Sequence, residues 1–107
     1  YKKFIDQLAA GSALGITNTM RGVQSKRAPL YAHKDRIAAL HVPALVVLGE
    51  EDEPCVKPSH FLEETLPGAR LEIVPKTGHC VNLEEPALYN RLVMGFIEGV
   101  EARRARP

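Results

Sequence analysis

Residues 42–52, VPALVVLGEED, carry the clearest indication of the fold. Six of the first seven residues are aliphatic, and the exception, Pro43, stands near the start, where a strand tolerates a missing N–H. A continuous apolar run between turn signals is typical of a strand that is buried on both faces of a parallel sheet. Gly49 allows a sharp turn as the chain leaves the sheet. Asp52 is then expected in the loop at the carboxyl end of the strand, where open α/β sheets bind their ligands.

A second strand and loop follow the same plan. Residues 71–74 predict a shorter strand, a loop runs through residues 75–78, and His79 comes directly after Gly78. The carboxyl ends of parallel strands meet at one edge of a sheet, so Asp52 and His79 are predicted to lie close together. An acid followed by a histidine, each after a strand, supplies two of the three members of a hydrolytic triad.

Four short motifs carry a resemblance to a known family. They are PxLVxxGxxD at residues 43–52, PGA at 67–69, GH at 78–79 and EEP at 84–86. With a strand before each loop and a helix between, the chain resembles the carboxyl-terminal part of an α/β-hydrolase-fold enzyme over roughly residues 28–100. The resemblance implies an α/β fold made of the last two parallel strands with flanking helices. It also implies that residues 1–28 are the end of a helical cap and residues 29–107 belong to the core.

The resemblance also assigns roles to the two polar residues. His79 would act as general base and then general acid, while Asp52 would hold the imidazole in one tautomer and stabilise its cation. Asp52 stands in the acidic run 50–53, which in another context would be a solvated loop. The family motif places the acid three residues after Gly49, which selects Asp52, with Glu51 and Glu53 as alternatives.

The helices can be outlined from apolar spacing. One helix is expected over residues 58–65 with Pro58 in its first turn, and one over residues 33–40. A capping-box-like start at Asn82 and Glu85 opens a long helix whose apolar face runs to Val100. Alternation over residues 69–74 predicts an edge strand with Leu71 and Ile73 on one face.

Composition excludes several functions. The net charge of +1 gives no electrostatic case for binding nucleic acid or an anionic membrane. No apolar run spans a bilayer, no signal peptide is visible, and we expect a cytoplasmic protein without a cofactor. Cys55 and Cys80 are expected to be free thiols, with a disulfide as the alternative. A metal site formed by them with Asp52 and His79 is conceivable, but the spacing matches no zinc pattern, so no metal is predicted.

The nucleophile is missing from the sequence. No Gly-x-Ser-x-Gly turn is present, and the one look-alike, Ser12, has Gly11 directly before it and follows a helical pattern. The oxyanion-hole loop is absent as well, and two parallel strands make too small a sheet. We therefore expect the nucleophile and most of the sheet to lie before Tyr1. The isolated chain is predicted to be inactive and to need that amino-terminal half or self-association.

The predicted parent activity is hydrolysis of a small acyl substrate, most readily a carboxylic ester, by a serine hydrolase. Alternatives within the same fold are carbon–carbon bond, lactone, haloalkane and epoxide hydrolysis. The last two use an aspartate nucleophile. A non-catalytic binding or assembly module that keeps the fold is the alternative from another class, because fold alone does not fix function.

Overall fold

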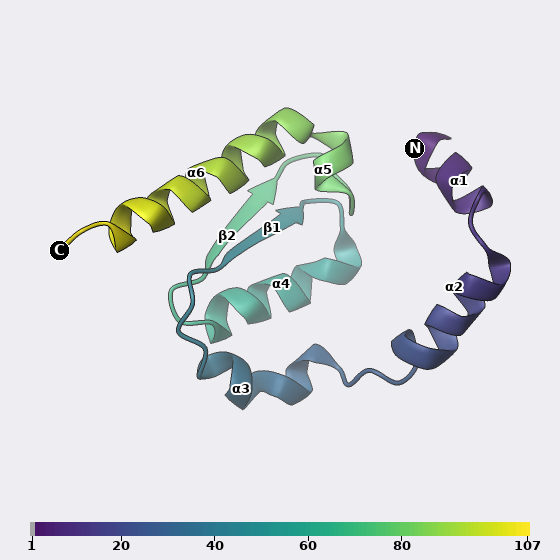
Figure 1. Ribbon diagram of the computed structural model, residues 1–107, viewed down its shortest axis with the longest axis horizontal. Coiled ribbons are helices and arrows are strands. Elements are labelled where there is room, and N and C mark those ends of the chain that lie inside the picture. The colour runs from purple at the N-terminus through teal and green to yellow at the C-terminus, as the bar shows by residue number, and fades with distance from the viewer. Residues whose placement is uncertain (1) are drawn as a thin grey trace. The chain divides into compact units, whose positions relative to one another are not determined.

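The computed structural model describes residues 2–107, and the chain divides into two compact units, Tyr1–Ala32 and His33–Pro107. This division falls four residues after the boundary expected between cap and core. The second unit holds both described strands and the helices that flank them (Figure 1). Whether the first unit is the end of a helical cap stays a prediction.

A parallel pair of strands forms the centre of the second unit. Strand β1, Leu45–Gly49, pairs in parallel with β2, Arg70–Val74, in a register that sets Val47 beside Glu72 and Gly49 beside Val74. The strand β1 begins two residues after Pro43, which lacks the N–H that a paired strand needs. Within residues 2–107 the sheet has only these two strands, so each has one unpaired edge.

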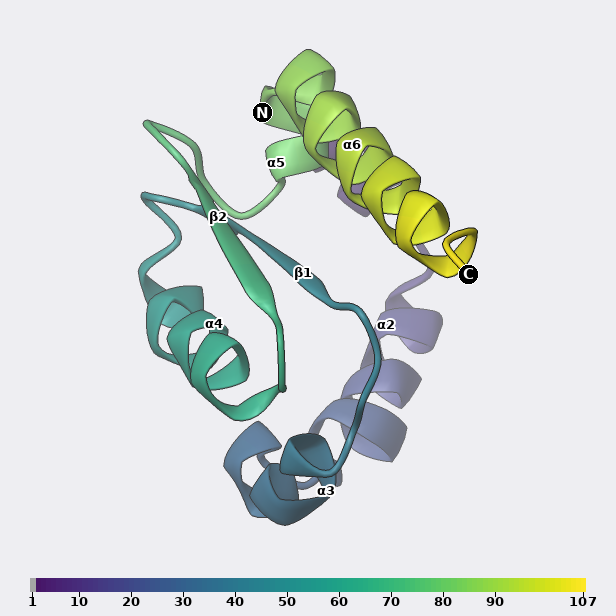
Figure 2. The same ribbon diagram turned by 90° about the vertical axis from the view of Figure 1, so that its left-hand side faces the viewer.

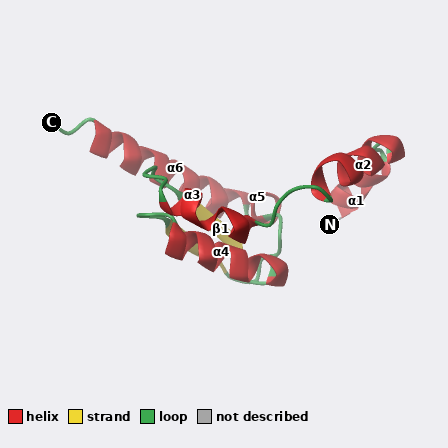
Figure 3. Cartoon of the chain, turned by 90° about the horizontal axis from the view of Figure 1, so that it is seen from below, coloured by secondary structure: helices red, strands yellow, loops and turns green. Residues whose placement is uncertain are grey.

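Helices flank the sheet on both faces (Figures 2 and 3). Helix α4, Glu53–Thr65, connects β1 to β2 and lies on one face. The last helix, α6, Pro86–Arg104, lies on the other face after the short helix α5, Val81–Glu84. A groove of about 460 Å³ between β1 and α6 is lined by apolar and aromatic side chains: Leu45, Val47, Tyr89, Val93, Phe96 and Ile97. This face of the sheet is therefore only partly covered by α6.

Helix α4 begins earlier than predicted. It starts at Glu53, so Pro54 occupies the first turn, where a missing N–H costs nothing, and Pro58 lies inside the helix. The prediction of a start at Pro58 was wrong because either proline could have opened the helix. The early start places Asp52 at the N-cap of α4, immediately after the β1 loop. The capping box was also wrong, since Cys80 and Glu85 occupy the N-cap positions of α5 and α6.

The buried core of the second unit is small. Among the described residues, the buried apolar side chains are those of Ile37, Leu48, Val74 and Val81. Ile73, expected with Leu71 on one face of an edge strand, is 48% exposed. Its strand is at the edge of a sheet that α4 does not fully cover. Ile37 belongs to α3, Lys34–Ala38, which follows the 3-10 turn Leu30–His33 and replaces the single helix expected over residues 33–40.

The first unit is helical. It contains α1, Lys2–Ala9, then α2, Ala13–Thr19, which continues into a π-helical segment, Met20–Gln24. None of these three segments has a buried side chain. Across residues 2–107, no helix combines the length and apolar character that crossing a membrane requires.

Candidate active site

Backbone hydrogen bonds join the two loops that follow the strands. The Glu50 N–H donates to the Val74 carbonyl and the Glu51 N–H donates to the Thr77 carbonyl, each at 2.9 Å. Thr77 is fully buried, and its hydroxyl donates to the Pro75 carbonyl at 2.8 Å. The two loops therefore pack together beyond the sheet edge. This packing fixes the positions of Asp52 and His79, which follow in the chain.

Gly49 is required by this close packing. A Cβ atom at Gly49 would overlap the carbonyl oxygens of Thr77 and Gly78. Its backbone is not in the left-handed region, since Gly68 is the one described glycine with positive φ. The sharp turn predicted at Gly49 is therefore not what requires a glycine here; the close approach of the second loop requires it.

Two carboxylates hold the loop that carries the histidine. The carboxylate of Glu50 accepts from the N–H of Lys76, and the carboxylate of Glu84 accepts from the N–H of Gly78, each at 2.9 Å. Lys76 has φ of 52°, a left-handed conformation that costs a non-glycine residue energy. These contacts of Glu50 and Glu84 are not predictable from the sequence, because nothing in the spacing of the two residues shows which amide each would meet.

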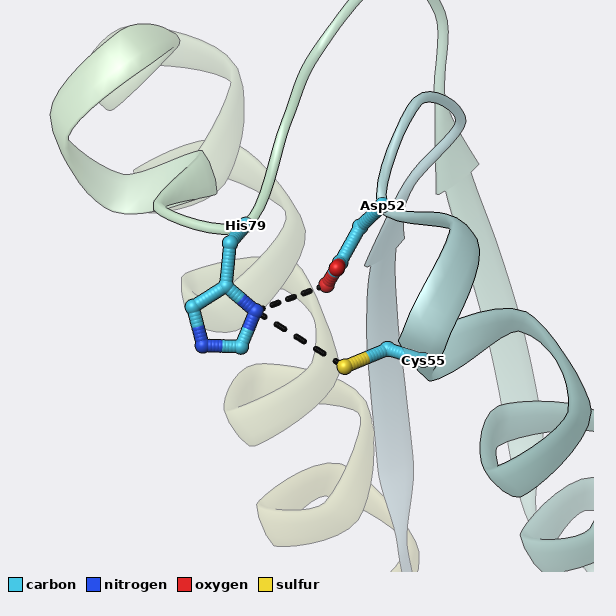
Figure 4. Close-up of side chains that lie close together, drawn as sticks. All are labelled: Asp52, Cys55 and His79. Carbon is cyan, nitrogen blue, oxygen red and sulfur yellow. Dashed lines mark hydrogen bonds and ion pairs between the residues drawn. The ribbon is translucent and has the colours of Figure 1, made fainter.

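Asp52 and His79 meet across the two loops (Figure 4). His79 Nδ1 lies 2.8 Å from Asp52 Oδ2. An ionised carboxylate can only accept, so Nδ1 carries the proton and donates it. In the neutral ring, Nε2 is then left as an acceptor. This is the tautomer that a histidine needs to take a proton from a nucleophile.

The two members of this dyad differ in exposure. The Asp52 side chain is 10% exposed and the His79 side chain is 75% exposed. The pKa of the Asp52 carboxyl lies below its ordinary value of 3.8, mainly because of the hydrogen bond from His79. A hydrogen bond from Cys55 lowers the pKa further, whereas burial raises it. Asp52 is therefore charged at neutral pH. Glu51 and Glu53, the alternative acids, are exposed. Among the residues that the structure describes, Asp52 is the acid whose carboxylate contacts His79.

Cys55 is the third side chain at this point. Its Sγ lies 3.7 Å from His79 Nδ1, but that nitrogen already donates to Asp52. The thiol proton therefore points toward the Asp52 carboxylate. This contact, with burial, raises the pKa of the Cys55 thiol above its ordinary value of 9.0. Cys55 and Cys80 are both free, as expected.

Three side chains of types that bind metals come together at one place within residues 2–107. One ligand atom each from Asp52, Cys55 and His79 lies within 4.8 Å of the others. Cys80, which the sequence analysis considered as a fourth member, is outside this group. The close approach of Cys55 comes from the early start of α4, which the sequence analysis missed.

Ser12 has a structural role of its own. It is the N-cap of α2, and its Oγ accepts from the Gly15 N–H at 3.0 Å. It lies between two helices, whereas the nucleophile of an α/β-hydrolase stands on a strand-to-helix turn. Ser12 therefore caps a helix, and its position does not support a role as the nucleophile of a triad.

Comparison with known proteins relates this chain to enzymes. A protein of Bacillus subtilis (strain 168), provisionally named 2-succinyl-6-hydroxy-2,4-cyclohexadiene-1-carboxylate synthase, is 32% identical over 87 residues, which are 81% of this chain and 31% of the relative. A proline iminopeptidase of Lactobacillus delbrueckii subsp. bulgaricus is 35% identical over 69 residues, covering 63% of this chain and 23% of the relative. No protein-family model matches the chain.

A solved structure agrees with these sequence matches. The structure of Est816, described as an N-acyl homoserine lactone degrading enzyme, aligns with a TM-score of 0.56 and 41% identity over 59% of this chain and 25% of that one. The chain is homologous to α/β-hydrolase family members over a part of their length. The resemblance and the fold class are thereby confirmed. The chain spans less than a third of the length of these relatives.

Proposed function

We propose that this chain supplies the acid and the base of a triad hydrolase that acts on small acyl substrates, with carboxylic esters as the substrate class. The observation that carries the proposal is the 2.8 Å contact between His79 Nδ1 and Asp52 Oδ2. It leaves Nε2 of an exposed imidazole free to accept a proton. Homology to α/β-hydrolase enzymes supports the same chemistry.

The roles follow from the geometry. His79 Nε2 would take the proton of a nucleophile hydroxyl as it attacks the ester carbonyl. The imidazolium that forms would be stabilised by the charged carboxylate of Asp52, and its proton would pass to the leaving alkoxide. A water would then repeat the sequence to release the acid. The chain's own residues thus account for every proton transfer but not for the covalent step.

The nucleophile and the oxyanion hole would come from a segment of the fold outside these residues. The second edge of β1 is unpaired within residues 2–107, and an unpaired apolar edge invites another strand. The groove between β1 and α6 leaves apolar side chains of both elements for such a segment to cover. We therefore propose that activity requires the nucleophile-bearing half of the fold.

Lactone opening is a second candidate. A lactone is a cyclic ester, so the same dyad would serve, and the observation that favours it is the 41% identity with the lactone-degrading Est816 structure. The names of the three relatives nevertheless describe a synthase, a peptidase and a lactone-degrading enzyme. Substrate class therefore has to be measured.

The test compares turnover of a p-nitrophenyl ester and an acyl lactone by the protein assembled with its nucleophile. Replacement of His79 by alanine should abolish turnover of both substrates. Replacement of His60, an exposed histidine whose Nδ1 is 3.8 Å from Glu63, should leave both unchanged. Full activity of the His79→Ala variant would refute triad chemistry at His79. No turnover of either substrate by the assembled wild type would instead favour a binding or assembly role.

A further inference from the structure

We propose that Asp52, Cys55 and His79 bind a Zn²⁺ ion and that the bound ion switches the dyad off. The three side chains offer a carboxylate oxygen, a sulfur and an imidazole nitrogen, all within 4.8 Å of one another. They point toward a common centre from two elements, the start of α4 and the loop after β2 (Figure 4). Binding of zinc does not depend on the proposed function, whereas the switching effect rests on it.

The distances suit a tetrahedral ion. Zinc bonds of about 2.3 Å to sulfur and about 2.0–2.1 Å to nitrogen or oxygen set ligand atoms roughly 3.3–3.6 Å apart. Cys55 Sγ and His79 Nδ1 are already 3.7 Å apart. Asp52 Oδ2 and His79 Nδ1, at 2.8 Å, would have to separate slightly as the hydrogen bond between them is replaced by two bonds to the metal.

The surrounding structure preorganises these ligands. Asp52 is the N-cap of α4 and Cys55 lies three residues later, so one helix turn fixes their spacing. His79 follows Gly78, whose N–H is held by Glu84. The His79 side chain is 75% exposed, which leaves a water free to take the fourth position. A site with three protein ligands and one open position needs only small side-chain movements here.

The donor set selects the metal. Thiolate and imidazole are ligands that Zn²⁺ accepts readily, whereas Mg²⁺ and Ca²⁺ prefer oxygen ligands throughout. Binding would release the thiol proton of Cys55 to solvent, since the metal binds the thiolate. It would also replace the proton on His79 Nδ1, and the neutral ring would then carry its proton on Nε2. A protonated Nε2 cannot accept, so the base would be lost.

The test of the site measures binding and needs no turnover. Zinc is titrated into the protein in competition with a chromophoric chelator, with Mg²⁺ as the control ion. Wild type should bind one zinc ion per chain. Cys55→Ala and His79→Ala should each weaken binding by more than the roughly 10–100-fold that loss of an outer-shell partner costs. Cys80→Ala and His60→Ala, a free thiol and an exposed histidine, should bind as wild type does.

Two results would overturn the site. One is equal zinc affinity in wild type and Cys55→Ala, and the other is an equal loss in Cys80→Ala. Circular dichroism of each variant, together with a Cys55→Ser variant that keeps the side-chain size, separates lost ligands from lost folding. The switch is tested separately by adding zinc and then a chelator to the active assembled protein. Tight zinc binding without reversible loss of turnover would refute the switch while leaving both the site and the proposed hydrolase intact.

Discussion

The backbone of Gly78 lies against the α-carbon of Gly49, so close that no side chain can be placed between them. This contact joins the loop that ends in Asp52 to the loop that ends in His79. With the hydrogen bonds from the Glu50 and Glu51 N–H groups to the Val74 and Thr77 carbonyls, it sets the separation of the Asp52 and His79 side chains. The geometry of the proposed dyad therefore depends on the backbone packing beneath it.

Replacing Gly49 by alanine should destabilise the protein. The added methyl must displace the backbone of residues 77–78, and overpacking of this kind costs about 1–3 kcal/mol or more. Urea unfolding would measure the loss in the free energy of unfolding. Gly95→Ala is the matched control, because nothing lies within 4 Å of a Cβ there and alanine in a helix is favoured by up to about 1 kcal/mol. Equal effects of the two substitutions would refute the packing argument.

Replacing Glu84 by alanine should loosen the histidine loop. The Gly78 N–H would lose its carboxylate acceptor, and an exposed charge-assisted hydrogen bond of this kind contributes about 1 kcal/mol. Turnover in the assembled enzyme should fall further than stability, since His79 is the next residue. Glu84→Gln keeps an acceptor oxygen and should restore most of both. Glu85→Ala, on an exposed neighbour, should change neither measurement, and a loss there equal to that of Glu84→Ala would contradict the assignment.

Lys76→Gly should stabilise the protein by about 1 kcal/mol. Lys76 adopts φ of 52°, which costs a residue with a side chain about 1–2 kcal/mol and costs glycine almost nothing. The N–H donated to Glu50 is retained in the variant. Lys57→Gly, inside α4, should instead destabilise by up to about 1 kcal/mol. Thermal unfolding of both variants checks the sign, and destabilisation by Lys76→Gly would contradict it.

The dyad should make stability depend on acidic pH. The pKa of Asp52 is lower in the folded chain than its ordinary value of 3.8, with the His79 hydrogen bond as the largest cause. The folded state therefore binds fewer protons than the unfolded state near that pH. The stabilisation is fully present above pH 3.8 and is lost as the pH falls through the lower, folded pKa. The difference in the free energy of unfolding between wild type and Asp52→Asn should be flat above that range and shrink below it. A difference that grows on acidification would contradict the assignment.

The sequence predicted the dyad because both residues follow strands whose carboxyl ends must meet. The pairing of Asp52 with His79 needed only strand order and the position of Gly49, both visible in the chain. The roles of Glu50, Glu84 and Cys55 could not be predicted in the same way. Each depends on which loop atom comes within hydrogen-bond distance after packing.

The errors in the predicted fold have local physical causes. Two prolines stand near the start of α4, and propensity does not decide whether Pro54 or Pro58 occupies the first turn. The exposure of Ile73 agrees with the edge strand expected from the alternation, because the pattern shows which residues share a face and not how far a helix covers that face.

The Asp52–His79 dyad is tested by labelling with a fluorophosphonate probe, followed by intact-mass analysis of every chain in the active protein. We predict label on a serine outside these 107 residues, no label after His79→Ala, and normal label after His60→Ala. Asp52→Asn should slow labelling strongly, because replacing the aspartate of a triad by asparagine lowers kcat roughly 10⁴-fold. Label on Ser12, label that survives His79→Ala, or an active protein that takes no label would contradict these predictions.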